Sequence, residues 1–96
     1  MADITAIRAA VGPDVPIMGI SKLAMADGGL FITPTGESAR AIIAAGANLV
    51  ALESTSRPRP DESLETVIEA VHAAGGLAMA DCGTFEDAQV ALAVGA

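Results

Sequence analysis

The chain has 96 residues and a formal net charge of −7; 52% of its residues are hydrophobic, and only 2% of all residues are aromatic. A chain of this length buries about 60–65% of its extended surface, so it forms one small domain or part of a larger one. Its five basic residues are scattered, which argues against nucleic acid or an anionic membrane surface as a partner, because phosphate groups require clustered Lys and Arg.

No apolar run approaches the roughly 18 residues of a membrane span, and the first residues lack the pattern of a signal peptide. Cys82 is the single cysteine, so no disulfide can form within the chain, which agrees with a reducing compartment. We therefore expect a cytoplasmic protein without a membrane span. Cys82 has no second thiol or neighbouring His, and no Gly-rich nucleotide-binding motif occurs, so we expect neither a metal nor a cofactor.

The first predicted helix lies at the N-terminus, with Asp3 as its cap and Gly12 at its end. Its apolar positions recur at helical spacing and are Ile4, Ile7 and Val11. Residues 15–21 are rich in β-branched side chains and predict a strand that Lys22 closes. We expect residues 23–31 to form an excursion loop with a turn at Asp27-Gly28-Gly29.

The second predicted helix follows Thr35, which is a suitable cap, with Glu37 in its first turn and Gly46 just past its end. The hydroxyl groups of Thr33 and Thr35 are also available to a ligand, although a capping threonine needs none. Residues 49–53 are an apolar run that ends in Glu53, which is typical of a parallel strand reaching the rim of a site. We take this run as the central strand.

The third predicted helix has the clearest apolar periodicity in the chain. Its buried positions are Leu64, Val67, Ile68 and Val71. Either Asp61 or Ser63 caps it, and Gly75-Gly76 ends it. Residues 77–81 then form the third strand, and Thr84 begins a fourth helix that runs through Val94.

A weak repeat predicts the fold class. Ala45-Gly46-Ala47 and Ala74-Gly75-Gly76 each precede a strand, and the same pattern at Val94-Gly95-Ala96 leads us to expect another strand from about residue 97. Three βα units with parallel strands, roughly thirty residues apart, fit an arc of a (β/α)8 TIM barrel. They also fit part of an open doubly wound sheet.

Three ionisable residues are expected at one edge of this sheet, because parallel strands end on the same side. They are Lys22, Glu53 and Asp81. A lysine beside carboxylates in a partly dry pocket can act as a general acid or base. The structural alternative is a rim lysine that forms a salt bridge.

Arg57 and Arg59 lie in a loop whose prolines present both guanidinium groups in an extended backbone. Such a loop can bind a phosphate group or orient a sugar. The alternative is that both arginines pair with nearby carboxylates, namely Asp61, Glu62 or Glu53.

Four segments carry a resemblance to a known family. In this order and spacing, VPIMGISK, ITPT, LVALESTSRPRP and HAAGGLAMADCGTFEDA resemble the bacterial N-acetylmannosamine-6-phosphate 2-epimerase family over nearly the whole chain. The resemblance implies that residues 1–96 are the third to fifth βα units of a (β/α)8 barrel. It also implies a small phosphosugar substrate, interconversion of N-acetylmannosamine 6-phosphate and N-acetylglucosamine 6-phosphate in sialic acid catabolism, and no redox cofactor.

The resemblance also assigns roles to residues. Lys22 matches the family's catalytic lysine, which is proposed to move the proton at C2 of the sugar, and Asp81 matches an aspartate of the substrate pocket. Glu53 stands where the family usually has Asp, and Leu23-Ala24 stand where it usually has Arg and Tyr. Glu53, Arg57 and Arg59 are our further candidates for substrate binding.

Two expectations concern the isolated chain. The family's second catalytic group, a glutamate on a later strand, and its phosphate-binding loops are expected beyond Ala96, so residues 1–96 alone are expected to be inactive. The unpaired sheet edges are expected to favour association into a homo-oligomer. The alternatives are another phosphosugar barrel, acting on a ribulose or indole-glycerol phosphate, and a non-catalytic α/β binding or interaction domain.

Overall fold

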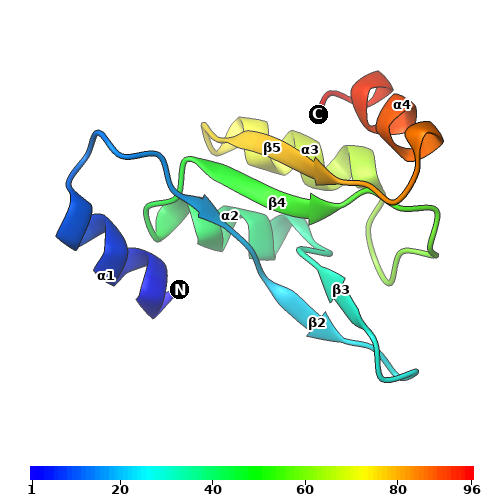
Figure 1. The fold of residues 1–96 in the computed structure, drawn as a ribbon, viewed down its shortest axis with the longest axis horizontal. Helices are drawn as coiled ribbons and strands as arrows, with labels where there is room; N and C mark the ends of the chain where they lie inside the picture. Colours follow the sequence, from blue (N-terminus) through cyan, green and yellow to red (C-terminus); the bar gives the residue numbers. More distant parts are fainter.

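The computed structural model describes all of residues 1–96 as four helices and five strands in an α/β arrangement (Figure 1). In chain order the elements are α1 (Ala2–Val11), β1 (Met18–Gly19), β2 (Lys22–Ala24), β3 (Leu30–Ile32), α2 (Gly36–Ala44), β4 (Leu49–Glu53), α3 (Leu64–Ala73), β5 (Leu77–Asp81) and α4 (Phe85–Ala93). None of the helices combines the length and the apolar character needed to cross a membrane.

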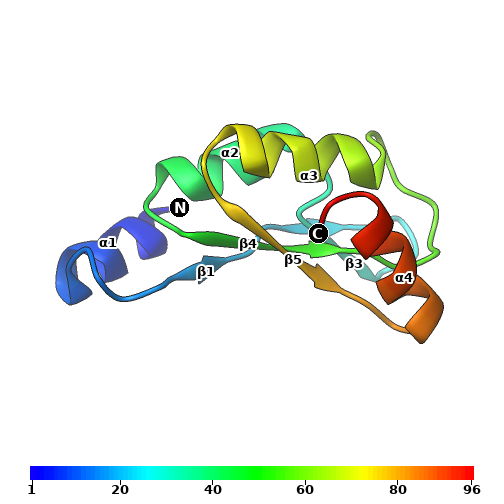
Figure 2. The ribbon, with the colours of Figure 1, turned by 90° about the horizontal axis from the view of Figure 1, so that it is seen from above.

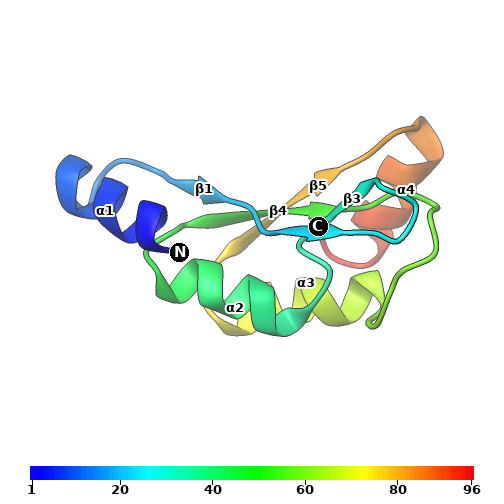
Figure 3. The same ribbon diagram turned by 90° about the horizontal axis from the view of Figure 1, so that it is seen from below.

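The main sheet has three parallel strands in the order β1-β4-β5, so β4 is the central strand, as predicted. Strands β4 and β5 have the predicted bounds, and their register pairs Leu49 with Leu77 and Glu53 with Asp81. Helices α2 and α3 lie side by side on one face of this sheet (Figures 2 and 3). Strands β1 and β5 form the two edges, and association through them stays a prediction.

The hydrophobic core lies between the sheet and helices α2 and α3. Val50 and Leu52 alternate along β4 and are fully buried against this layer, as the two-residue period of a strand requires. Burying an aliphatic side chain of this size contributes about 1.5–3 kcal/mol. The predicted apolar face of α3 is confirmed, and the core consists of Ile17, Ala39, Ile42, Ala47, Val50, Leu52, Val67, Ile68 and Val71.

The first strand is shorter than predicted. Only Met18 and Gly19 pair with β4, because Pro16 has no amide hydrogen and the amide of Ile17 donates to Asn48 Oδ1 over 2.9 Å. After Ser21 the chain leaves the main sheet. Lys22 therefore begins strand β2, and the expectation that it closes the first strand is wrong.

The segment expected to be an excursion loop is a β-hairpin. Strands β2 and β3 pair antiparallel, with Lys22 opposite Ile32. The predicted turn joins them: Gly28 has a φ of 87°, and the amide of Gly29 donates to Asp27 Oδ1 over 2.8 Å. The hairpin extends from the carboxyl-terminal side of β1 (Figure 1).

Three of the helices begin at hydroxyl caps. Thr35, Ser63 and Thr84 each accept the amide hydrogen of the residue three positions further on, so the predicted caps of α2 and α4 are confirmed and Ser63, rather than Asp61, caps α3. Asp3 does not cap the first helix. Helix α1 already begins at Ala2, which places Asp3 inside its first turn.

Candidate functional site

A pocket of about 280 Å³ opens at the carboxyl ends of β4 and β5, beside the hairpin. This is the edge at which parallel α/β folds place their sites. Its lining combines a carboxylate pair, one guanidinium group and small polar groups with apolar side chains of the hairpin. The lining residues are Leu30, Ile32, Glu53, Thr55, Arg57, Asp81, Cys82 and Gly83.

Two of the predicted site residues, Glu53 and Asp81, are direct neighbours across β4 and β5. The Glu53 side chain is buried, with 6% of the residue exposed, whereas Asp81 is exposed to solvent. Of the three residues expected at this edge, Glu53 and Asp81 meet there as predicted, whereas Lys22 lies on the hairpin and does not line the pocket. Asp81 makes no side-chain hydrogen bond or ion pair, so its carboxylate is available to a ligand in the pocket.

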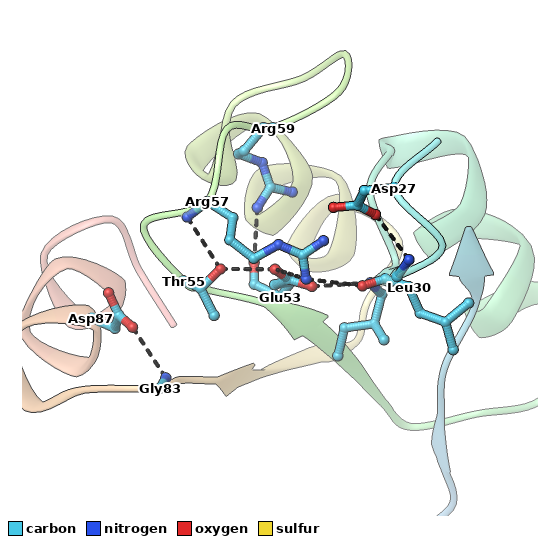
Figure 4. Close-up of polar contacts among 10 residues, drawn as sticks. Asp27, Leu30, Glu53, Thr55, Arg57, Arg59, Gly83 and Asp87 are labelled. Atoms are coloured by element: carbon cyan, nitrogen blue, oxygen red, sulfur yellow. Dashed lines mark hydrogen bonds and ion pairs between the residues drawn. The ribbon is translucent and has the colours of Figure 1, made fainter. Parts of the chain in front are cut away.

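Glu53 is the centre of the polar contacts in this pocket (Figure 4). Its Oε2 accepts a hydrogen bond from Thr55 Oγ1 over 2.8 Å and lies 3.3 Å from Nη1 of Arg57. Its Oε1 accepts from the amide of Ile32 over 3.4 Å. A buried carboxylate with these partners is fixed in position, and it connects β4 to both the hairpin and the following loop.

Arg57 pairs with Glu53, which is the structural alternative considered for this arginine. Its Nη1 also donates to the backbone oxygen of Leu30 over 3.0 Å, so it links the loop to strand β3. The Arg57 side chain remains 43% exposed. It lines the pocket with this exposed part and can still offer N–H groups to an anionic ligand.

Arg59 does not line the pocket, although the sequence placed it beside Arg57 as a candidate for substrate binding. Its Nε donates to the backbone oxygen of Glu62 over 2.7 Å and its Nη1 to that of Glu53 over 2.8 Å. Burial lowers the pKa of Arg59, an effect opposed by the charges of Glu53 and Glu62. Arg59 thus holds the loop from behind the pocket.

Both guanidinium groups lie over the ring of Phe31, which is 1% exposed. Their central carbons are 5.3 Å (Arg57) and 5.2 Å (Arg59) from the ring centroid. These distances are within the range of a cation–π interaction. The loop after β4 is therefore held against the hairpin by the hydrogen bond from Arg57 to Leu30 and by the contacts of both arginines with Phe31.

Lys22 is exposed, forms no ion pair or side-chain hydrogen bond and does not itself line the pocket. The salt-bridged rim lysine considered as the structural alternative is thus absent. Directly opposite residues of an antiparallel pair project to the same face, so Lys22 shares a face with Ile32. Ile32 lines the pocket, and we call the position of Lys22, on the same hairpin face as this lining residue, the border of the pocket.

Several lining residues were not singled out from the sequence. Leu30 and Ile32 reach the pocket only because the hairpin folds against the end of β4, and Thr55 does so through its bond to Glu53. Cys82 and Gly83 directly follow the end of β5, a position that is itself a usable signal. No group of three or more His, Cys, Asp or Glu side chains is arranged to hold a metal ion.

Replacing Glu53 with alanine is expected to lower the free energy of unfolding by about 1–3 kcal/mol, because Thr55, Arg57 and the amide of Ile32 lose a buried acceptor. Urea unfolding measures the loss. The matched control is Glu69→Ala, which removes an exposed carboxylate from α3 and is expected to change stability by less than about 0.5 kcal/mol. Equal losses in the two variants would contradict the central role of Glu53.

Comparisons with known proteins agree on one family. The family described as "Putative N-acetylmannosamine-6-phosphate epimerase" matches residues 1–96. Relatives named as putative N-acetylmannosamine-6-phosphate 2-epimerases are 42% identical over 85 residues in Photobacterium profundum and 41% identical over 96 residues in Escherichia coli. These alignments include 88% and 100% of the chain.

The fold is similar to that of a solved N-acetylmannosamine-6-phosphate 2-epimerase from Clostridium perfringens, with a TM-score of 0.85, 34% sequence identity and 97% of the chain covered. This likeness confirms the predicted arc of parallel βα units from a (β/α)8 barrel. The chain spans 40% of that structure, and 35% and 41% of the Photobacterium and Escherichia relatives.

Proposed function

The chain belongs to the N-acetylmannosamine-6-phosphate epimerase family, and from this premise we propose that the protein interconverts N-acetylmannosamine 6-phosphate and N-acetylglucosamine 6-phosphate. The observation that carries the proposal is the pocket at the ends of β4 and β5. It brings the Asp81 carboxylate and the Arg57 guanidinium group together, with Lys22 at its border. An amine, a free carboxylate and a cation suit proton transfer on an anionic sugar.

The proposed chemistry is a proton transfer at C2. In the open-chain sugar, C2 lies next to the C1 aldehyde, so the unprotonated amine of Lys22 removes the C2 proton while the bonding electrons move onto the carbonyl oxygen. The resulting lysine ammonium group stabilises the negative charge that forms there. Return of a proton to C2 from the opposite face inverts the centre.

The other pocket residues have binding roles in this proposal. Asp81 accepts hydrogen bonds from sugar hydroxyl groups, and the exposed part of Arg57 attracts the anionic substrate. Glu53 and Arg59 shape the pocket wall through their contacts with the loop. The half-buried position of Arg59 outside the pocket lining favours this supporting role over direct binding.

The proposal also covers the place of the chain in the whole barrel. We assign residues 1–96 to its third to fifth βα units, which leaves the second proton carrier and the phosphate site to other units. The reaction belongs to sialic acid catabolism and the setting we propose is the cytoplasm. The unpaired thiol of Cys82 suits a reducing compartment.

Solvent deuterium tests the proposed reaction directly. The full-length protein is incubated in D2O with N-acetylmannosamine 6-phosphate, and proton NMR follows the signal of the hydrogen at C2. We expect deuterium at C2 together with formation of N-acetylglucosamine 6-phosphate. A ribulose phosphate and an indole-glycerol phosphate serve as comparison substrates, and turnover of either one without exchange at C2 of the amino sugar would reject the epimerase proposal.

A further inference from the structure

Thr33 has a backbone conformation that is unusual for its residue type. Its φ of 42° makes it the only non-glycine residue of the chain with a positive φ. A β-branched side chain in this region is a genuine outlier, because the branched Cβ crowds the backbone. Thr33 is also fully buried, so surrounding contacts must hold it in this conformation.

The contacts of Thr33 join the hairpin to the central strand. Its Oγ1 donates to the backbone oxygen of Ala51 in β4 over 2.6 Å and accepts from the amide of Ser21 over 3.2 Å. Its own amide donates to the backbone oxygen of Ser21 over 2.7 Å. One buried side chain therefore ties β4 to Ser21, the residue directly before Lys22.

Thr33 makes the side-chain contacts that connect the residue before strand β2 to strand β4. On β3, the amide of Ile32 meets Glu53 and the backbone oxygen of Leu30 meets Arg57, so that strand is held by side chains of β4 and its loop. Strand β2 has no such contact with β4. Its position depends on pairing with β3 and on the two bonds between Ser21 and Thr33.

We propose that Thr33 is a positioning residue, whose buried hydroxyl and left-handed backbone fix hairpin β2–β3 so that Lys22 stays at the border of the pocket. The inference rests on the proposed function for its catalytic consequence. Its structural content is independent, because it concerns only where β2 lies relative to β4. Thr33 itself is buried and touches no substrate in this scheme.

The test compares two variants of similar shape. Thr33→Val keeps the β-branched form and removes the hydroxyl, whereas Thr33→Ser keeps the hydroxyl and removes a methyl group. Amide hydrogen exchange is measured at residues 21–24 and, as a reference, in the core strand β4. We expect Thr33→Val to speed exchange at residues 21–24 at least tenfold with little change at Val50 and Leu52, and Thr33→Ser to retain the protection of the original protein.

The kinetic measurement addresses the consequence for Lys22. In the full-length protein, Thr33→Val is expected to lower kcat for C2 exchange at least tenfold while changing KM less than threefold. Thr33→Ser is expected to retain most of kcat. Faster exchange spread evenly over the chain, or unchanged exchange at residues 21–24, would overturn the proposal. If the unsubstituted protein exchanges no C2 hydrogen, the epimerase function fails, while amide exchange still decides the positioning role.

Discussion

Replacing Lys22 with alanine is expected to lower the rate of deuterium exchange at C2 of N-acetylmannosamine 6-phosphate by about 10²–10⁴, the usual contribution of a positioned general base. The loss is expected in kcat more than in KM, because an exposed lysine at the border of the pocket adds little to ground-state binding. Stability is expected to change little, since the Lys22 side chain makes no hydrogen bond or ion pair. NMR kinetics and urea unfolding measure the two effects separately.

Two further variants separate the proton-transfer role of Lys22 from its charge. Lys22→Arg keeps a cation at the same position, but a guanidinium group stays protonated and cannot remove a proton from carbon, so it is expected to be as inactive as alanine. Arg40→Ala removes an exposed cation from α2 and is expected to leave exchange unchanged. Retention of more than about a third of the rate in Lys22→Ala would contradict the assignment.

Local patterns in the sequence account for the central layer of the fold. The apolar run of β4, the apolar run of β5 and the helical periodicity of α3 each predict an element with the bounds or the buried face that the structure shows. The apolar side chains of β4 and α3 pack into one buried layer, so their own sequence patterns specify these two elements. Glu53 and Asp81 then follow as neighbours from the parallel register alone.

The hairpin could not be predicted in the same way. Its strands have three residues each, too short for a two-residue period to be recognised, and its pairing depends on contacts between Thr33, Ser21 and Ala51 that are distant in sequence. The position of Lys22 depends on this hairpin. The place of Lys22 at the start of β2, outside the pocket lining, therefore could not be predicted from local sequence patterns.

The different positions of Arg57 and Arg59 also could not be predicted from the sequence. Arg57 and Arg59 are two positions apart in a polar loop and look equivalent in the sequence. In the structure Arg57 lines the pocket and Arg59 lies behind it, held by two backbone oxygens and the ring of Phe31. Both oxygen acceptors of Arg59 are close to it in the sequence, but the loop conformation that presents them, and the contact with the distant Phe31, could not be predicted from the residue types alone.

Gly19→Ala is expected to give the largest loss of stability among single-methyl additions in the chain, about 3 kcal/mol or more. A Cβ at residue 19 would lie 2.4 Å from Cγ2 of Ile42 and 2.9 Å from Cδ1 of Ile4. Ile42 is fully buried, and a β-branched residue in a helix has one strongly preferred χ1, so its Cγ2 can move only if α2 moves away from the sheet. Urea unfolding measures the loss.

Gly83→Ala is the matched control for this substitution, because its added Cβ would meet nothing closer than 3.5 Å and is expected to leave stability within about 0.5 kcal/mol of the original. A double-mutant cycle with Ile42→Ala identifies the cause. If the overlap with Cγ2 produces the loss, adding Gly19→Ala to the Ile42→Ala background costs much less than adding it to the original protein. An unchanged cost would show that α2 is not held against β1 by this contact.

Gly76→Ala provides a comparison with Gly19→Ala, because the added Cβ would also approach an isoleucine to 2.4 Å, in this case Cδ1 of Ile43. Cδ1 is the free end of a half-buried side chain and can rotate away, whereas Cγ2 of Ile42 is fixed to the helix through Cβ. Gly76→Ala is therefore expected to cost less than half as much as Gly19→Ala. Equal costs would mean that the backbone oxygen of Asn48, 3.3 Å from the added Cβ, limits the space at residue 76 rather than Ile43.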